Sequence, residues 1–274
     1  NFKVSMDILK ELVSRNNWFV LTGAGVSLDS GIPTYRDSEG NWTRSIPVES
    51  QDFIRSSDVR RRFWARNMVG WRFMSEAKPN HNHLHLAHIQ KKGGISCLTT
   101  QNVDGLHQKA GSTDVIDLHG RLDSVTCLSC GLKLARQYIQ NVLIENNPHY
   151  AVITGAILPD GDAEIDKIPY GSFFVPDCPN CGGILKPDAV FFGDSVPKHI
   201  VSKAIDSLKS SNGVLVVGSS LNTYSGFRFC RLAKEARKKL IIINKSPTRA
   251  DNITDIKVSA DCSEVLSEWA AFIS

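Results

Sequence analysis

The sequence predicts an α/β fold, in which a parallel sheet domain carries an inserted small cysteine-rich lobe and a helical lobe. Short apolar runs of strand length alternate with helical patterns at both ends of the chain. A glycine turn, Gly23-Ala24-Gly25, follows the first of these runs. Four cysteines form two Cys-x-x-Cys pairs in the middle of the chain. Together these features predict a ligand-binding sheet that is interrupted by a metal-stabilised segment.

The predicted sheet domain begins with an amphipathic helix over residues 6–15, because its apolar residues recur on one helical face. The apolar runs that follow predict buried strands, and the helical patterns between them predict crossover helices. Such βαβ units give a Rossmann-like parallel sheet with right-handed crossovers. The predicted strands are Trp18–Thr22, Ile95–Thr100, Val214–Gly218 and Leu240–Asn244, and the later helices are 198–210, 226–239 and 263–273.

Two segments depart from this alternation. Residues 37–93 have a polar, helical pattern and predict a helical insertion lobe. Residues 121–188 hold the cysteine pairs and predict a zinc-binding lobe, with a helix near 133–146 and a long loop within 131–177. The remainder forms the Rossmann-like core, and the whole chain, 1–274, is expected to be one catalytic domain.

The cysteine pairs have the spacing of a tetrahedral zinc site with four thiolate ligands, because each tight turn directs two sulfurs at one metal ion. Each pair is also followed by a glycine. Such a site is closed and leaves no position for a reactive water, so we expect one structural zinc ion. Four unrelated thiols or two disulfides are the alternatives. The predicted ligands are Cys127, Cys130, Cys178 and Cys181.

Composition narrows the class of protein. The 274 residues carry a net charge of +4 and 22% charged residues, which is typical of a globular domain. The one compact basic run, Arg60-Arg61-Arg62, is better explained as a solvated helix face, so nucleic acid is not expected as a partner. No apolar stretch is long enough to span a bilayer, so no membrane partner is expected. Seven cysteines in a chain of this length favour a reducing compartment.

Polar residues follow several of the predicted strands, where open α/β sheets bind ligands. The glycine turn after Trp18–Thr22 can let a backbone approach a pyrophosphate, or can be a structural turn. The cluster Thr100–His107 favours a binding site over a turn. His119 lies at the junction with the cysteine lobe, where a histidine can face a cleft, although a lone histidine is more often structural. Gly218-Ser219-Ser220 can bind phosphate or ribose, or simply turn the chain.

Taken together and in this order, the motifs resemble those of the sirtuin family of NAD-dependent protein deacylases, over nearly the whole chain. The long loop and the segment from Trp64 to Trp71 resemble the mitochondrial class II branch, and most of all the sirtuin-four type. The motifs that carry the resemblance are Gly23–Ser27, Gly31–Arg36, Thr100–Asp104, Leu118-His119-Gly120, the four cysteines, Val190–Asp194 and Val217–Leu221.

The resemblance implies a role for each matching residue. His119 would be the general base, and Asn102 and Asp104 would complete the catalytic group. Val190, Phe191 and Gly193 would pair with the substrate backbone, while Phe63 and Arg66 would contact the acyl group. The implied NAD-binding residues are Gly23, Ala24, Gly25, Ser27, Ile32, Tyr35, Arg36, Gln101, Asn102, Asp104, Gly218, Ser219, Ser220, Asn244 and Cys262.

The implied reaction transfers the acyl group of a modified protein lysine to ADP-ribose and releases nicotinamide. Histidine suits the base because its unperturbed pKa is about 6.5. The sirtuin-four type, which the chain resembles, is associated with lipoamidase, branched acidic deacylase and ADP-ribosyltransferase activities and with the mitochondrial matrix. The family usually has Asp where this chain has Thr34, and Phe where it has Tyr35.

Desuccinylase relatives carry Tyr-x-x-Arg where this chain has Phe63-Trp64-Ala65-Arg66, so Arg66 keeps the charge while Phe63 lacks the hydroxyl. We therefore expect weaker removal of succinyl groups and a preference for lipoyl or for branched acidic acyl groups. A protein mono-ADP-ribosyltransferase and a non-catalytic NAD-sensing interaction module are the alternative functions.

Overall fold

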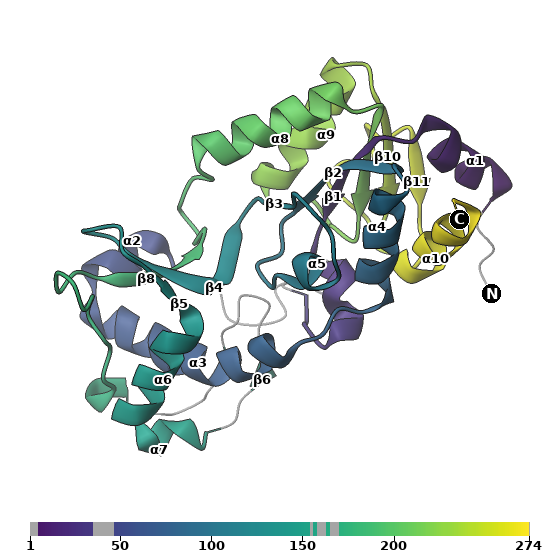
Figure 1. The fold of residues 1–274 in the computed structure, drawn as a ribbon. Helices are drawn as coiled ribbons and strands as arrows, with labels where there is room; N and C mark the ends of the chain where they lie inside the picture. The colour runs from purple at the N-terminus through teal and green to yellow at the C-terminus, as the bar shows by residue number, and fades with distance from the viewer. Residues whose placement is uncertain (1–4, 35–46, 154–155, 158–162, 165–169, 274) are drawn as a thin grey trace.

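The computed structural model describes residues 5–34, 47–153, 156–157, 163–164 and 170–273. It has a larger part built on a parallel sheet and a smaller lobe, and strand β4 runs from one to the other (Figure 1). Of the predicted site residues, Tyr35 and Arg36 lie outside the described ranges, as do several residues of the long 131–177 loop.

The larger part is a six-stranded sheet in which every neighbouring pair is parallel. Its spatial order is β11-β10-β9-β1-β2-β3, so the winding direction reverses between β1 and β9. This is the strand order of a Rossmann-type sheet, and the reversal marks the place where such sheets bind ligands. The strands are β1 (Trp18–Thr22), β2 (Ile95–Thr100), β3 (Ile116–Asp117), β9 (Gly213–Val217), β10 (Lys239–Ile243) and β11 (Ile256–Val258).

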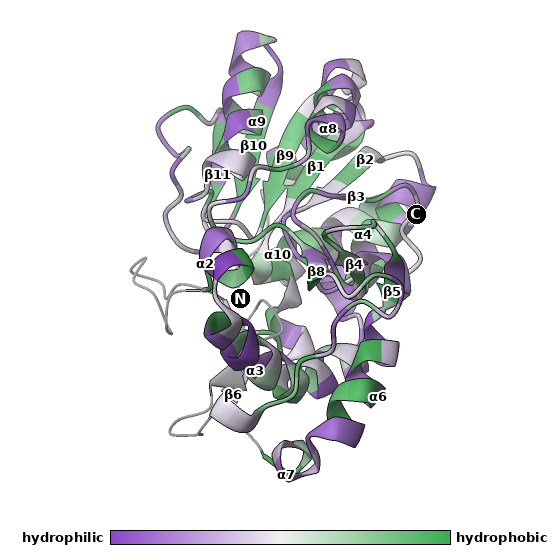
Figure 2. Ribbon diagram, turned by 90° about the vertical axis from the view of Figure 1, so that its left-hand side faces the viewer, coloured by the Kyte–Doolittle hydropathy of each residue, from purple (hydrophilic) through white to green (hydrophobic). Residues whose placement is uncertain are grey.

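Helices cover both faces of this sheet, and the strands are hydrophobic along their length (Figure 2). All residues of β1 and β9 are buried, as expected for strands that are covered on both sides. On one face Trp18 packs in a cluster with Trp269, and on the other face Phe19 packs against Phe229. The covering helices are α1 (Met6–Arg15), α4 (His81–Lys91) and α10 (Cys262–Phe272) on the first face, and α8 (Lys198–Ser210) and α9 (Tyr224–Glu235) on the second.

The last helix of the segment predicted as a helical lobe, residues 37–93, packs with the sheet domain. Helix α4 belongs to the sheet domain, because Leu86 and Ile89 are fully buried in the cluster around Trp18 and Trp269. The described helices of the lobe are α2 (Ser50–Arg55) and α3 (Ser57–Glu76). The polar pattern of residues 37–93 therefore covers two structural units, which composition alone does not separate.

The smaller lobe joins α3 to a three-stranded antiparallel sheet in the order β5-β4-β8. Its core contains Phe53, Trp64 and Met68 from the helices, with Val125 from β4 and Ile139 from α6. The predicted helix over 133–146 begins at Arg136, because the three residues before it form β5 and pair with β4. The elements are β4 (Gly120–Cys127), β5 (Lys133–Ala135), α6 (Arg136–Asn146), α7 (Pro148–Ala151), β6 (Ala156–Ile157), β7 (Ala163–Glu164), η2 (Tyr170–Ser172) and β8 (Leu185–Ala189).

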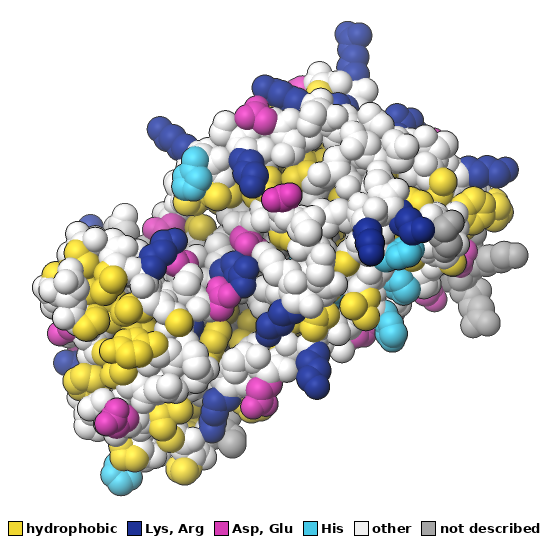
Figure 3. Space-filling model, viewed as in Figure 1, with side chains coloured by type: hydrophobic (Ala, Val, Ile, Leu, Met, Phe, Trp, Pro, Cys, Tyr) yellow, Lys and Arg dark blue, Asp and Glu magenta, His cyan; other side chains and the backbone are white. Residues whose placement is uncertain are grey.

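Two short elements lie at the carboxyl ends of the strands, the 3-10 helix η1 (Ala24–Ser30) after β1 and the helix α5 (Leu106–Lys109) after β2. Among the described helices, none is both long enough and apolar enough to cross a bilayer. On the face shown in Figure 3, Lys and Arg side chains are scattered among acidic ones instead of forming one dense surface.

Candidate active site and metal centre

A cavity of about 1680 Å³ opens where the strand order of the sheet reverses. The loops after β1 and β9 form one wall, and the junction with the smaller lobe forms the opposite wall. Because Thr22 pairs with Val217, the two strands end side by side and both loops start at the same level. Pockets for one small molecule are usually about 300–1,000 Å³. This cavity therefore has room for two ligands together.

Close contact between these loops explains the glycine turn. A Cβ on Gly25 would lie 2.8 Å from the Cα of Gly218, and a Cβ on Gly23 would lie 2.7 Å from the Cβ of Ser219. The Gly25 N–H donates to the Gly218 carbonyl at 2.8 Å. The glycines thus let two backbone segments meet, and Gly23, Ala24 and Gly25 line the cavity with little side-chain bulk.

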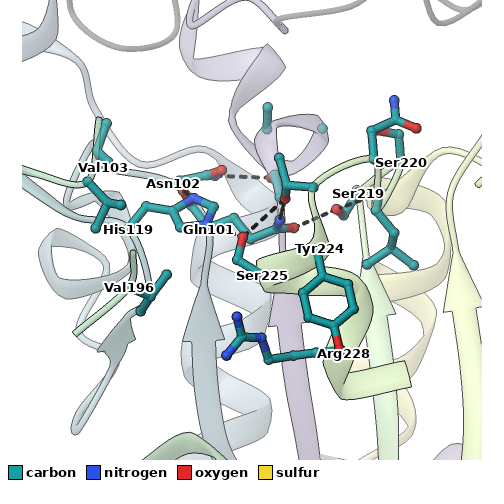
Figure 4. Close-up of a pocket in the computed structure, with 18 of the residues that line it drawn as sticks. Gln101, Asn102, Val103, His119, Val196, Ser219, Ser220, Tyr224, Ser225 and Arg228 are labelled. Carbon is teal, nitrogen blue, oxygen red and sulfur yellow. Dashed lines mark hydrogen bonds between the residues drawn. The ribbon is translucent and has the colours of Figure 1, made fainter. Parts of the chain in front are cut away.

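His119 lies between β3 and β4, at the junction of the two parts of the molecule, and lines the cavity (Figure 4). Its Nδ1 is 3.0 Å from the Gln101 carbonyl oxygen, which can only accept, so Nδ1 carries the proton. Its Nε2 is then an acceptor, 2.7 Å from the Ser225 hydroxyl. Burial lowers the pKa of His119, the Gln101 carbonyl offsets part of that change, and the positive charge of Arg228 lowers it further. The imidazole is therefore a neutral base with Nε2 as its basic atom.

Asn102 also lines the cavity, and two of the predicted residues lie behind it. Its amide group donates to the Gly23 carbonyl at 3.0 Å and to the Ser27 hydroxyl at 3.2 Å. Ser27 in turn donates to the Asp104 carboxylate at 2.7 Å. Ser27 is fully buried, and neither Ser27 nor Asp104 is part of the described cavity wall. Their contacts orient Asn102, which is the member of the three that a ligand would meet.

Two buried histidines support this group from below. The Asn80 N–H donates to Nδ1 of His83, so the Nε2–H of His83 faces the Ser27 hydroxyl at 3.3 Å. His107 packs edge-on against His83, with ring centroids 4.9 Å apart. Burial lowers the pKa of His83 to about 4 and that of His107 to about 3. Both rings are therefore neutral at pH 7.

The His107 ring is linked to the cavity wall through threonine hydroxyls. Its Nε2 lies 2.8 Å from the Thr22 hydroxyl, which donates to the Thr100 hydroxyl at 2.8 Å. The Thr100 oxygen then accepts the Asn102 N–H at 3.1 Å. The ends of β1 and β2 are thus tied together directly beneath Asn102.

A second hydrogen-bonded chain crosses the floor of the cavity. Ser219 donates to the Gln101 side chain at 2.6 Å, and Gln101 donates to the Thr223 hydroxyl at 3.1 Å. Further along, the cavity is lined by Ser220, Asn244 and Cys262. Gln101, Ser219, Ser220 and Asn244 lie at the carboxyl ends of β2, β9 and β10, and Cys262 begins α10.

On the opposite side, Val190, Phe191 and Gly193 line the cavity directly after β8. The Val190 N–H donates to the His119 carbonyl at 2.8 Å, which attaches this segment to the base. Of the two predicted acyl contacts, Phe63 lines the cavity, whereas Arg66 is buried and does not belong to the described wall. Ile32 is likewise buried away from the described wall, while Thr34 lies on it.

The four predicted zinc ligands come together in the smaller lobe. Their sulfur atoms all lie within 4.8 Å of one another, with Cys127 3.5 Å from Cys181 and Cys130 3.7 Å from Cys178. A tetrahedral zinc ion with Zn–S distances of about 2.3 Å holds its sulfurs about 3.8 Å apart. All four cysteines are free of disulfides, so the group fits one structural zinc ion.

Sequence reasoning missed two cavity residues on α9. Ser225 contacts the basic nitrogen of His119, and Arg228 places its guanidinium on the His119 side of the cavity (Figure 4). Both follow a recognised strand, but their direction depends on where α9 begins. The sequence predicts that start two residues too late, at 226 instead of Tyr224. A more accurate helix start would have placed both residues on the turns nearest the cavity.

Most of the chain is similar in sequence to known proteins. The model of the Sir2 family matches residues 23–225. NAD-dependent protein deacetylase 2 of Bradyrhizobium diazoefficiens is 46% identical over 97% of this chain and 98% of its own length. The NAD-dependent protein deacetylase of Bordetella bronchiseptica is 48% identical over 91% of both chains. NAD-dependent protein deacylase Sirt4 of Drosophila melanogaster is 44% identical over 95% of this chain and 85% of its own length.

Solved structures give the same comparison in three dimensions. A Sir2 homologue in complex with NAD superimposes with a TM-score of 0.75 at 28% identity, covering 98% of this chain and 94% of its own. Over nearly its whole length, this chain therefore has the fold of a known Sir2 homologue.

Proposed function

Since this chain belongs to the Sir2 family, we propose that it is an NAD-dependent protein lysine deacylase, which transfers an acyl group from lysine to ADP-ribose and releases nicotinamide. The observation that carries the proposal is the neutral His119, held by the Gln101 carbonyl with its basic nitrogen in the same cavity as Asn102. A fixed neutral imidazole next to room for two ligands is what an acyl transfer between two bound substrates requires.

The residues at the strand ends fit a dinucleotide. Gly23 and Gly25 leave backbone surface exposed to a pyrophosphate, and Ser219, Ser220 and Asn244 offer polar groups for phosphate and ribose. Bound NAD supplies the electrophilic ribose carbon and the nicotinamide leaving group. Asn102, held by Ser27 and Gly23, would orient the carboxamide of the ring.

The chain itself contributes positioning and proton transfer. Val190, Phe191 and Gly193 would align the substrate backbone by strand addition, which brings the acyl-lysine amide to the cavity. His119 Nε2 would accept a proton from a ribose hydroxyl, once that hydroxyl replaces the Ser225 oxygen that contacts it at 2.7 Å. Four thiolates close the coordination of zinc, so its role is to hold the smaller lobe against the cavity.

We also propose that the enzyme prefers lipoyl or branched acidic acyl groups, and that within the family it belongs near the sirtuin-four type. Phe63 lies in an aromatic cluster, 5.2 Å from Phe53 and 5.1 Å from Phe191 between ring centroids. An aromatic wall without a hydroxyl favours long or branched acyl groups such as lipoyl or 3-hydroxy-3-methylglutaryl over succinyl. The similarity to fly Sirt4 supports the same placement.

The test is a panel of acyl-lysine peptides incubated with and without NAD and followed by mass spectrometry. Deacylation that requires NAD and releases nicotinamide supports the proposed deacylase activity. A clear preference for succinyl would reject the proposed acyl preference. His119→Tyr should abolish turnover and leave zinc content and folding unchanged. If, without an acyl-lysine peptide, nicotinamide is released and radiolabel passes from NAD to protein, the chain is an ADP-ribosyltransferase instead.

A further inference from the structure

Arg228 is a charged residue of the cavity wall that the proposed reaction does not use. It lies on the second turn of α9, and its guanidinium carbon is 5.3 Å from the centre of the Tyr224 ring. Its Nε is buried and has no hydrogen-bond partner. Within the described part of the chain, no carboxylate forms an ion pair with it. Figure 4 shows its guanidinium on the side of the cavity that holds His119 and Val196.

The acidic groups of the same wall do not neutralise this charge. Asp194 pairs with Lys186, whose Nζ is 3.3 Å from its carboxylate. Asp206 is exposed on α8, Asp261 is the N-cap of α10, and neither forms a described ion pair with Arg228. The field of Arg228 reaches the catalytic base, because its charge lowers the pKa of His119. A half-buried guanidinium with an unpartnered N–H, close to the base, is an incomplete anion site.

The arginine that the sequence offered for this role is elsewhere. Arg66 is buried, is not part of the described cavity wall, and has interaction partners elsewhere. Phe63, which does reach the cavity, presents only an aromatic ring. Of these two arginines, only Arg228, on α9 of the sheet domain, lies on the described cavity wall, and its charge acts on His119.

We propose that Arg228 is a specificity-determining residue that binds a carboxylate carried by the acyl-lysine substrate. The inference rests on the proposed deacylase function and names the charge that selects among its substrates. A guanidinium offers parallel N–H groups that match the two oxygens of a carboxylate. Stacking on Tyr224 limits the rotation of its plane, so less conformational freedom is lost on binding.

Two parts of a substrate could supply the carboxylate, the free end of a dicarboxylic acyl group or an acidic side chain beside the modified lysine. The test therefore uses four peptides of one sequence. They carry acetyl-lysine with neutral neighbours, glutaryl-lysine with neutral neighbours, the glutaryl methyl ester, and acetyl-lysine with an adjacent glutamate. The enzymes are the parent protein, Arg228→Met, Arg228→Lys, and Arg231→Met as the matched control.

Arg231 is a suitable control because it lies on the same helix, is not on the described cavity wall, and pairs with Glu235 at 3.8 Å. Its substitution removes the same charge from the outer face of α9. Assays at pH 8 keep His119 neutral in every variant, so a change in its pKa does not enter the comparison.

We expect Arg228→Met to lower kcat/KM for one class of acidic peptide by about 10- to 100-fold relative to the neutral acetyl peptide. A lower kcat/KM on the glutaryl-lysine peptide but not on its methyl ester identifies the acyl chain as the source of the carboxylate. A lower kcat/KM on the glutamate-containing peptide identifies the flanking residue as that source. Arg228→Lys should recover part of the loss, and Arg231→Met should change neither ratio.

Equal loss on all four peptides with a raised KM for NAD would overturn the inference, because Arg228 would then serve the cofactor. Unchanged ratios in Arg228→Met would overturn it as well. Failure of the parent protein to release nicotinamide with any acyl-lysine peptide, including lipoyl- and 3-hydroxy-3-methylglutaryl-lysine, would instead contradict the proposed function, so the two failures are distinguishable.

Discussion

The sheet domain and the smaller lobe supply opposite walls of one cavity, but they are stabilised by different interactions. In the sheet domain, β1, β9 and most of β10 are buried among large apolar clusters. The smaller lobe has short strands and a smaller core that includes two of the four grouped cysteines. The first wall is held mainly by hydrophobic burial, and the second depends on a metal ion as well. The two walls should therefore lose their structure under different conditions.

Loss of zinc should have the largest effect, and it should be confined to one region. Structural zinc contributes on the order of 10 kcal/mol in small metal-stabilised units. We expect Cys178→Ser or a strong chelator to abolish protection of amide hydrogens in β4, β5 and β8 while β1, β9 and β10 stay protected, as measured by hydrogen exchange.

Cys97→Ser is the control for that experiment, since Cys97 lies in β2 and its sulfur already contacts the Thr99 hydroxyl at 3.6 Å. It should leave both zinc content and exchange in the smaller lobe unchanged. Global loss of protection in the Cys178→Ser protein would contradict the view that the two regions are stabilised separately.

Acid should destabilise the sheet domain through His83 and His107. Their pKa values of about 4 and about 3 lie below the ordinary value of 6.5, so the unfolded chain binds more protons than the native one as pH falls from 6.5. Stability is full above pH 6.5 and is lost as pH decreases toward those values. At pH 5 the loss is about 2 kcal/mol for each histidine.

The measurement is the free energy of urea unfolding at pH 7.5 and pH 5. His107→Gln should lower stability at pH 7.5 but reduce the difference between the two pH values. Because only the difference is compared, any acid-induced loss of zinc cancels between parent and variant. An unchanged difference would contradict the assignment of His107 as a neutral buried ring.

The comparison also explains which features could be predicted from sequence. The strands Trp18–Thr22 and Ile95–Thr100 were predicted with their observed bounds, because a buried parallel strand is a continuous apolar run between turns. The four cysteines were predicted as one group because metal geometry restricts their spacing, and the structure brings them together. Asn102 follows a predicted strand and His119 lies at the junction with the cysteine lobe, and both line the cavity.

What the sequence did not predict depends on packing at longer range. Helix α4 was assigned to the helical lobe, because a half-polar helix shows its apolar face without showing which core it joins. The strands β3 and β11 have only two and three residues, too few for any periodicity. Arg66 and Arg228 are equally basic in the sequence, and only the fold places Arg228 on the cavity wall and Arg66 behind it.

Substitution of Gly25 should have a smaller effect on stability, because the two glycine loops pack closely at the carboxyl ends of β1 and β9. In Gly25→Ala the new methyl group would meet Gly218 backbone atoms at 2.8–3.1 Å, and backbone cannot move aside as a flexible side chain can. Overpacking of this kind typically costs about 1–3 kcal/mol. We expect a lower melting temperature together with weaker NAD binding by calorimetry.

Gly171→Ala in the smaller lobe is the matched change, since nothing lies within 4 Å of the added methyl group and its φ is not positive. It should leave NAD binding unaltered. Equal effects of the two substitutions would show that the contact between the loops is not what makes the glycine turn necessary.

The smallest expected effect lies where the two regions meet, in the pH dependence of His119. Burial and the nearby Arg228 charge lower its pKa, so the base stays neutral below the ordinary value of 6.5 and the acid limb of kcat/KM should lie below that pH. As pH falls through the actual pKa, Nε2 becomes protonated and can no longer accept a proton. Arg228→Met removes one of the two lowering effects, so the limb measured on a neutral acetyl-lysine peptide should move to higher pH. Arg231→Met should leave it in place, because that charge lies on the outer face of α9. A limb that moves equally in both variants would mean that the net charge of the helix, and not the guanidinium beside the base, sets the pKa.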